Sequence, residues 1–163
     1  VARNEQLQLA PMVEEIFTDL APLAEQRSIT LEAEGDAALT GSDALIYRLL
    51  FNLTENAVKY NRPGGSVRVE LVQGQEKCII RVSDTGCGIP EEYQRSIFQP
   101  FFRVDKSRSR EYGGAGLGLS LVWEISNLHG GSVWVEESSD KGTTIAVELP
   151  AGAENDSPGA DIP

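Results

Sequence analysis

This sequence of 163 residues has few cysteines, few basic residues and no long apolar segment. Its two cysteines, Cys78 and Cys87, have no Cys/His cluster around them, so they suggest neither a disulfide framework nor a cysteine-based metal site, and a reducing compartment is the simplest setting. No apolar run approaches the ~18 residues that span a bilayer, and no segment resembles a signal peptide. We therefore expect a soluble, cytoplasmic chain.

Basic residues are outnumbered: Lys and Arg total 14, Asp and Glu total 25, and the formal net charge is −11. Proteins that bind nucleic acid or anionic membranes need a basic surface to neutralise phosphates, so neither partner is expected. The positive charge is concentrated in residues 95–112, where Asp105 and Glu111 are the acidic residues. The basic residues there are Arg95, Arg103, Lys106, Arg108 and Arg110. Such runs are commonly solvated faces, but this one adjoins a glycine cluster and would suit an anionic ligand.

The length and the 40% hydrophobic content suffice for one buried core, which predicts a single domain over residues 1–150. Residues 151–163 are rich in Ala, Gly, Pro and acidic residues and lack a core-forming pattern. They are predicted to be a disordered tail. Because the chain begins with Val1 rather than Met, we expect it to be an excised or processed piece of a longer protein.

Apolar residues recurring at spacings of three and four predict helices over residues 12–26, 43–60 and 115–129. Ser42 or Asp43 is expected to cap the second of them. Short alternating segments predict strands, most of them paired as hairpins. They are residues 29–33 with 38–40, 67–71 with 79–82, and 132–136 with 143–149, preceded by an edge strand within 4–10.

The densest glycine cluster, residues 113–118, runs directly into the third predicted helix. Glycines let the backbone approach a ligand and turn its N–H groups toward it, and a helix N-terminus favours negative charge. The cluster predicts a phosphate-binding loop, although flexible loops and tight helix starts use the same residues.

Asn52, Asn56 and Lys59 lie four and three residues apart on the second predicted helix and therefore share one face. Two asparagines cost about 1 kcal/mol relative to better helix formers, which favours a role in ligand binding. The alternative is a helix edge with satisfied polar groups and an ion pair between Glu55 and Lys59.

Asp84 ends a predicted strand and is followed by Gly86 and Gly88. The glycines leave room beside the strand end, so the Asp84 carboxylate can point inward. An ordinary turn would have the same sequence pattern. Residues 91–112 show no sustained period, and a loop of ~20 residues in a compact domain is commonly functional. The glycines at both of its ends predict a hinged lid. The aromatic cluster Phe98–Phe102 could equally be a partner-docking patch.

Four motifs occur together in a defined order. They are Asn52-x-x-x-Asn56, Asp84-x-Gly86-x-Gly88, Phe98–Phe102 and Gly114-x-Gly116-x-Gly118. This combination, covering about residues 5–149, resembles the ATP-binding catalytic domain of sensor histidine kinases, within the wider gyrase/Hsp90/histidine-kinase/MutL superfamily. The resemblance implies an α+β two-layer sandwich of the Bergerat type, with a mixed, mostly antiparallel sheet packed on three helices and a mobile lid over Mg-ATP.

The resemblance also implies roles for single residues. Asp84 would accept a hydrogen bond from the adenine amino group, Thr143 would join it through water, and Tyr60 would pack beside the base or ribose. Asn56 would hold Mg²⁺ through its amide oxygen, a hard ligand suited to this ion, with Asn52 nearby and Lys59 near a phosphate. The other expected nucleotide contacts are Gly86, Gly88, Ile89, Lys106, Gly114, Gly116, Leu117, Gly118 and Leu119.

Catalysis is expected to involve Asn56, Lys59 and one lid arginine, because phosphoryl transfer depends on positioning and electrostatics. The sequence does not choose between Arg108 and Arg110. The only histidine, His129, precedes Gly130-Gly131 at a predicted helix end and is expected to be structural.

The family's phosphoacceptor histidine would then lie on a separate dimerising helical domain, and a cognate response regulator would be a further partner. We expect a monomeric fragment of a homodimeric parent, and an inner-membrane anchor for that parent is an open alternative. Two other functions stay open: another kinase or ATPase of the superfamily, and a catalytically silent nucleotide-sensing module.

Overall fold

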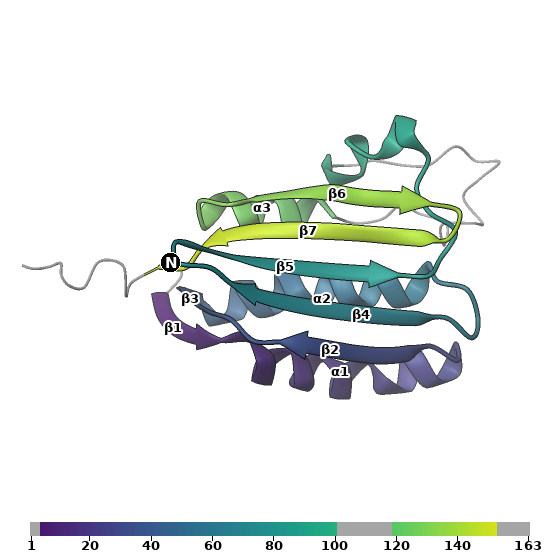
Figure 1. Cartoon of the computed structure of the whole chain (residues 1–163), viewed down its shortest axis with the longest axis horizontal. Helices are drawn as coiled ribbons and strands as arrows, with labels where there is room; N and C mark the ends of the chain where they lie inside the picture. Colours follow the sequence, from purple (N-terminus) through teal and green to yellow (C-terminus); the bar gives the residue numbers. More distant parts are fainter. Residues whose placement is uncertain (1–3, 101–118, 153–163) are drawn as a thin grey trace, which may run out of the picture.

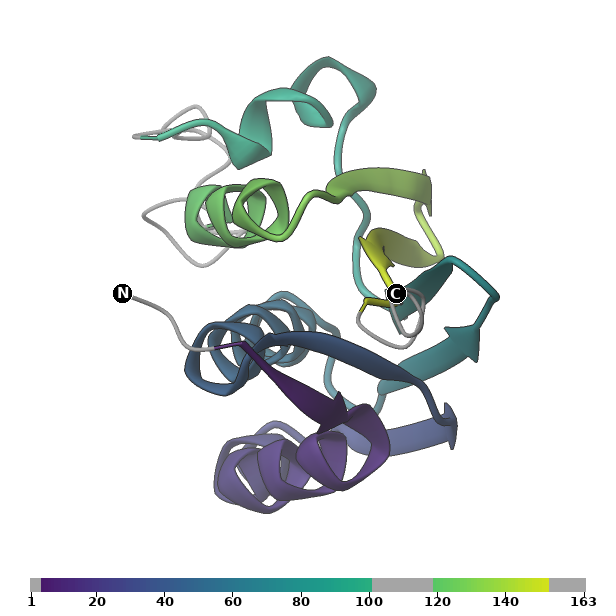
Figure 2. The ribbon, with the colours of Figure 1, turned by 90° about the vertical axis from the view of Figure 1, so that its left-hand side faces the viewer.

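The computed structural model describes residues 4–100 and 119–152. Its main feature is a five-stranded sheet with helices packed on one face, and none of the described elements covers the other face (Figures 1 and 2). In spatial order the strands are β2 (Thr30–Gly35), β4 (Ser66–Gln73), β5 (Lys77–Asp84), β7 (Gly142–Pro150) and β6 (Ser132–Ser139). The helices are α1 (Leu9–Gln26), α2 (Asp43–Lys59) and α3 (Ser120–Leu128). The predicted α+β two-layer sandwich is thus confirmed.

The sheet is mixed and mostly antiparallel, as expected. Strand β2 pairs with β4 in parallel, whereas the β4–β5, β5–β7 and β6–β7 pairs are antiparallel. The predicted hairpins in residues 67–82 and 132–149 are confirmed. Two single-turn 3₁₀ helices, η1 (Glu91–Tyr93) and η2 (Ser96–Phe98), follow β5.

The predicted hairpin between residues 29–33 and 38–40 is wrong. Strand β3 (Ala38–Ser42) instead pairs antiparallel with β1 (Asn4–Gln8) in a separate two-stranded sheet. The Asp36 carboxylate explains the divergence, because its Oδ1 accepts hydrogen bonds from the N–H groups of Ala37 (2.7 Å) and Ala10 (2.9 Å). These bonds tie the turn before β3 to the start of α1.

Helix α1 begins at Leu9, three residues before the predicted start at residue 12. The Leu9 side chain is fully buried, and its N–H donates to the Ala37 carbonyl at 2.9 Å. The Asp36 carboxylate also lies at this end, where negative charge stabilises a helix. The start of α1 therefore depends on a segment almost thirty residues away in the sequence, a distance that local patterns do not bridge.

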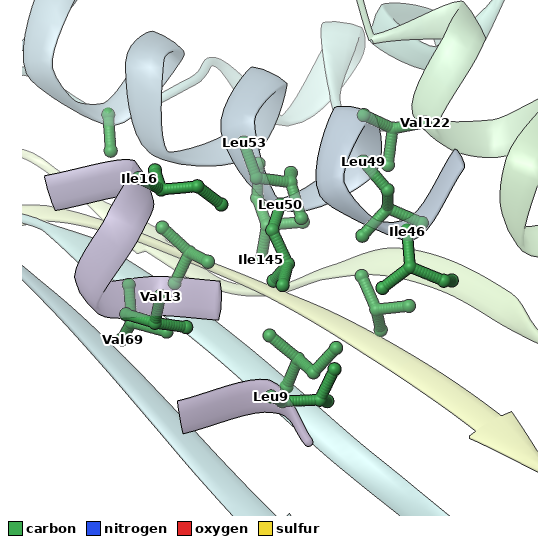
Figure 3. Close-up of a cluster of buried hydrophobic side chains, with 14 of the residues drawn as sticks. Leu9, Val13, Ile16, Ile46, Leu49, Leu50, Leu53, Val69, Val122 and Ile145 are labelled. Atoms are coloured by element: carbon green, nitrogen blue, oxygen red, sulfur yellow. The ribbon is translucent and has the colours of Figure 1, made fainter. Parts of the chain in front are cut away.

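The hydrophobic core lies between the helices and the sheet (Figure 3). Ile46, Leu49 and Leu53 form the buried stripe of α2, as their spacing predicts, and Ile145 faces the helix from the sheet. The Ser42 side chain caps α2 by accepting the Leu45 N–H at 3.3 Å. This packing fixes the polar margin of α2 relative to the strands β5 and β7.

The two ends of the predicted domain lie partly outside the described residues. Of the predicted third helix, the structure describes Leu119 onward, and residues 115–118 fall outside. Of the predicted tail, residues 153–163 fall outside, whereas Ala151 is buried and its carbonyl accepts the Thr40 N–H at 3.2 Å. Within residues 4–100 and 119–152, no helix combines the length and apolar character that a membrane span requires.

His129 joins the C-terminal end of α3 to the N-terminal end of α2. Its Nε2 accepts the Ser42 N–H at 3.1 Å, and its Nδ1 lies 2.9 Å from the Ile125 carbonyl oxygen. A neutral ring with its proton on Nδ1 satisfies both bonds. A Cβ on Gly41 would lie 2.7 Å from the imidazole Cδ2, so glycine is needed for this close approach. His129 therefore has a structural role, as the sequence predicts.

We predict that His129→Ala destabilises the fold. The substitution leaves the Ser42 N–H without its acceptor and should lower the free energy of unfolding by about 1–3 kcal/mol. Urea unfolding followed by circular dichroism measures this change. Asn127→Ala, at an exposed position two residues away, is the control and should shift stability by no more than about 0.5 kcal/mol. Equal urea midpoints for His129→Ala and the control would contradict the role.

Candidate functional site

The C-terminal half of α2 lies over the end of the sheet where β5 finishes and β7 begins (Figure 1). Residues from these three elements line a pocket there. Its walls are mostly apolar, with polar groups at a few points. The lining residues are Leu53, Asn56, Ala57, Tyr60, Val82, Asp84, Cys87, Gly88, Ile89, Leu119, Thr143 and Ile145. Apolar walls with a few convergent polar groups are typical of small-molecule sites.

The pocket brings together residues that are far apart in the sequence. Of the predicted site residues, it is lined by Asn56, Tyr60, Asp84, Gly88, Ile89, Leu119 and Thr143. Antiparallel pairing of β5 with β7 sets Asp84 directly opposite Thr143. Val82 and Ile145, which also pair in register, form the apolar floor beside them. The two strands thus place a carboxylate next to a hydroxyl at the end of an apolar slot.

The Asp84 carboxylate is the main electrostatic feature of this slot. Burial raises its pKa to about 6, and hydrogen bonds from the backbone N–H groups of Gly86 and Thr143 partly oppose that shift by stabilising the charged form. The Gly86 bond to Oδ1 measures 2.8 Å. At neutral pH the group is a partly buried carboxylate held in place by the backbone. It can accept a hydrogen bond from a ligand that presents an N–H.

Gly86 and Gly88 make room for the loop that follows Asp84. A Cβ on Gly86 would collide with the carbonyl oxygen of Tyr60, so the loop can pack against the end of α2 only with glycine there. Gly88 has φ +84°, and a Cβ there would collide with the Ser139 carbonyl oxygen. Gly88 lines the pocket, whereas Gly86 lies behind it and supports the carboxylate.

The remaining predicted site residues are not on the pocket wall or are not described. Asn52 is half-buried one turn before Asn56, and Lys59 is exposed at the end of α2; neither lines the pocket. Lys106, Arg108, Arg110, Gly114, Gly116, Leu117 and Gly118 lie outside the described residues. The parts that these residues play stay predictions.

The side chains present suit a metal ion that takes few ligands from the protein. Within the described part of the chain, no three His, Cys, Asp or Glu side chains gather into a metal-binding group. Asn56 offers one amide oxygen at the pocket. Mg²⁺ commonly binds through one or two protein oxygens, several waters and substrate phosphates, so this donor set fits it when phosphates share the pocket.

Three residues that support the pocket were not predicted: Asn61, Thr85 and Ser138. Asn61 is buried, and its Oδ1 accepts the Thr85 hydroxyl at 2.9 Å, which joins the end of α2 to the end of β5. Ser138 Oγ accepts the Ile89 N–H at 2.8 Å and lies 2.8 Å from the Thr143 hydroxyl. The contact between Ser138 and Thr143 could have been indicated only by the strand register, which puts these two residues opposite each other.

Comparisons with known proteins point in one direction. Residues 41–153 match the family described as histidine kinase-, DNA gyrase B- and HSP90-like ATPase. The chain is 37% identical over 145 residues to the sensor histidine kinase RppB of Synechocystis, covering 87% of this chain and 32% of RppB. It is 41% identical over 107 residues to the sensor histidine kinase WalK of Bacillus subtilis, covering 64% of this chain and 18% of WalK.

A similar structure has also been solved. The catalytic domain of the histidine kinase ThkA superimposes with a TM-score of 0.79 at 25% identity, covering 91% of this chain and 98% of that domain. This chain thus corresponds to one domain of its relatives, and it spans about a third of the length of RppB or less than a fifth of that of WalK.

We predict that Asp84→Asn stabilises the fold at neutral pH. Because folding raises the pKa of Asp84 to about 6, protonation favours the folded state: this contribution is complete below about pH 4 and is lost as the pH rises through 6. An uncharged Asn avoids the loss. The difference in free energy of unfolding between the variant and wild type should therefore shift in favour of the variant by about 2–3 kcal/mol from pH 4 to pH 7.5. Urea unfolding at both pH values measures the gain, and a constant difference would contradict it.

Proposed function

Because this chain belongs to the histidine kinase-, DNA gyrase B- and HSP90-like ATPase family, we propose that it binds Mg-ATP and supplies the γ-phosphoryl group to a histidine of its parent protein. Within that family it is of the sensor histidine kinase type. The observation that carries the proposal is the joint placement of Asp84 and Asn56 on one apolar pocket. In this proposal the purine lies between Val82 and Ile145 and the α2 side chains, with its polar edge at Asp84.

Asp84 recognises the base. Its buried carboxylate accepts a hydrogen bond from the exocyclic amino group of adenine, and Thr143 adds a hydroxyl beside it. Tyr60, at the end of α2, packs against the base or ribose. Little water competes with these bonds, because the walls around them are apolar.

Asn56 serves the phosphate end of the nucleotide. Its amide oxygen would hold Mg²⁺, which when bound neutralises phosphate charge and orients the γ-phosphoryl group. Asn52 and Lys59 lie on the same helix, four residues before and three after it, where an amide and an ammonium suit phosphate oxygens and their waters. Helix α2 thus serves both the base and the phosphates.

The reaction is a phosphoryl transfer. A neutral imidazole nitrogen of the acceptor histidine attacks the γ-phosphorus, the bond to the β–γ bridging oxygen breaks, and ADP leaves with that electron pair. Arg108 or Arg110 would stabilise charge on the transferring group when the lid closes, and the glycines of residues 113–118 would bind the phosphates. These last roles come from the sequence.

The acceptor histidine lies outside this chain. Both ring nitrogens of His129, the only histidine present, are engaged in structural hydrogen bonds. The parent protein would carry the acceptor on a dimerising helical domain, which makes the parent a homodimer and this chain alone a monomer. A response regulator would then take the phosphoryl group from that histidine.

We predict that Asp84→Asn weakens ATP binding about 100-fold, because the amide replaces a charged acceptor and turns its own N–H groups toward the adenine amino group. Isothermal titration calorimetry at pH 7.5 measures the affinity. The urea unfolding experiment proposed above serves as the control that the variant is folded. Unchanged ATP affinity in a folded variant would overturn the assignment of Asp84.

Asn56→Ala tests the phosphate end. We expect it to abolish the gain in ATP affinity that Mg²⁺ gives the wild-type chain, and to reduce phosphoryl transfer to the parent's helical domain, supplied in trans, by at least about 100-fold. Radiolabelled γ-phosphate on that domain measures the transfer. Asn127→Ala, on exposed α3 surface, is the matched control. If wild type binds Mg-ATP but never labels a histidine, the kinase function is wrong.

A further inference from the structure

We propose that Ser138 is a positioning residue that orients the Thr143 hydroxyl and thereby makes the pocket select adenine over a 6-oxopurine. The inference rests on the proposed function and deepens it. Ser138 lies on β6 opposite Thr143 on β7, and its side chain is half-buried outside the pocket wall. It can therefore influence a nucleotide only through its neighbours.

The hydrogen bonds around Ser138 restrict the direction of its proton. A hydroxyl has one proton to donate and two lone pairs that accept. One lone pair of Ser138 Oγ accepts the Ile89 N–H at 2.8 Å, and the Thr143 hydroxyl lies 2.8 Å away. When Ser138 donates to Thr143, the proton of Thr143 stays available to the pocket. When Thr143 instead donates its proton to Ser138, the Thr143 hydroxyl presents only lone pairs to the pocket.

The Asp84 carboxylate selects the first arrangement. Asp84 and Thr143 are paired in register, and the Thr143 N–H donates to the carboxylate. A negative charge on this wall makes it unfavourable for Thr143 to present only lone pairs to the pocket, so Thr143 keeps its proton on the pocket side, where a ligand can accept it, rather than donating it to Ser138. Ser138 completes this orientation by donating its own proton to Thr143 Oγ1.

The resulting pattern matches adenine. Adenine presents a donor, its 6-amino group, next to an acceptor, N1. The pocket offers a carboxylate acceptor at Asp84 and a hydroxyl donor at Thr143, which meets N1 directly or through a bridging water. A 6-oxopurine presents an acceptor at O6 and a donor at N1, so both contacts are mismatched. Mismatched buried polar groups discriminate strongly.

Ser138 also holds Ile89, and this second role must be separated from the first. Ile89 lines the pocket, so losing its bond to Ser138 would loosen the wall for any nucleotide. That effect would weaken the binding of ATP and of inosine triphosphate (ITP) equally. Loss of the Thr143 orientation would weaken the binding of ATP alone. The ratio of the two affinities therefore distinguishes a positioning role from a merely structural one.

The sheet contains a matched control. Ser83 and Thr144 form an equivalent hydroxyl pair, with 2.8 Å between their oxygens, on the neighbouring strand pair β5–β7. Because Thr144 follows Thr143 directly, its side chain points to the opposite face of the sheet. Neither Ser83 nor Thr144 lines the pocket. Ser83→Ala removes the same type of bond without affecting the pocket.

The test is calorimetric titration of the 163-residue chain with Mg-ATP and Mg-ITP. Ser138→Ala should weaken ATP about tenfold and ITP no more than about twofold, so that the affinity ratio falls about fivefold or more. Ser138→Thr, which keeps the hydroxyl, should restore the wild-type ratio. Ser83→Ala should leave it unchanged.

The outcomes separate this inference from the proposed function. If wild type binds ATP and Ser138→Ala leaves the ratio unchanged, the positioning role is wrong and the proposed function stands. If wild type binds neither nucleotide, the proposed function is overturned and the inference with it. Should Ser138→Ala fail to fold, Ser138→Cys keeps the side-chain size with a weak donor, and a wild-type ratio in that variant also refutes the role.

Discussion

The site depends on a carboxylate buried at the end of a strand. Taking the Asp84 side chain out of water disfavours its charged form, and two backbone N–H groups, from Gly86 and Thr143, offset part of that cost. The fold supplies both donors: the first requires a tight loop after β5, and the second requires β7 to pair with β5 in the observed register. A carboxylate retained at such a cost is more typical of a binding group than of a structural one.

Helix α2 shows how one element serves the core and the site together. Its apolar stripe, which includes Leu49 and Leu53, packs on the sheet and fixes the rotation of the helix about its axis. Because residues on a helix keep fixed angular spacing, that rotation also directs Asn56 and Tyr60 toward the pocket. The asparagines of α2 are poor helix formers, and the packing of the stripe compensates for them.

A set of uncharged side chains holds the pocket from behind. Asn61 and Thr85 join the end of α2 to the end of β5, and Ser138 joins the loop at Ile89 to the β6–β7 hairpin. Each hydrogen bond crosses between segments that line or adjoin the pocket. Such supporting bonds fix the orientation of the groups that face a ligand, which raises specificity because fewer arrangements of the pocket remain.

The sequence by itself determined most of the helices and strands, and it predicted Asn56 and Asp84 as site residues, which the structure brings together on one pocket. Apolar periodicity located α2 to within a residue and the β4–β5 and β6–β7 hairpins, because these features depend on neighbours only a few residues away. The four spaced motifs indicated the family, with Asn56 and Asp84 as its central residues. The tertiary structure alone decided the pairing of β3 with β1, the start of α1 at Leu9, the raised pKa of Asp84 and the contacts of Ser138. Each of these depends on groups brought together from distant parts of the chain, and their burial and strand register exist only once the chain has folded.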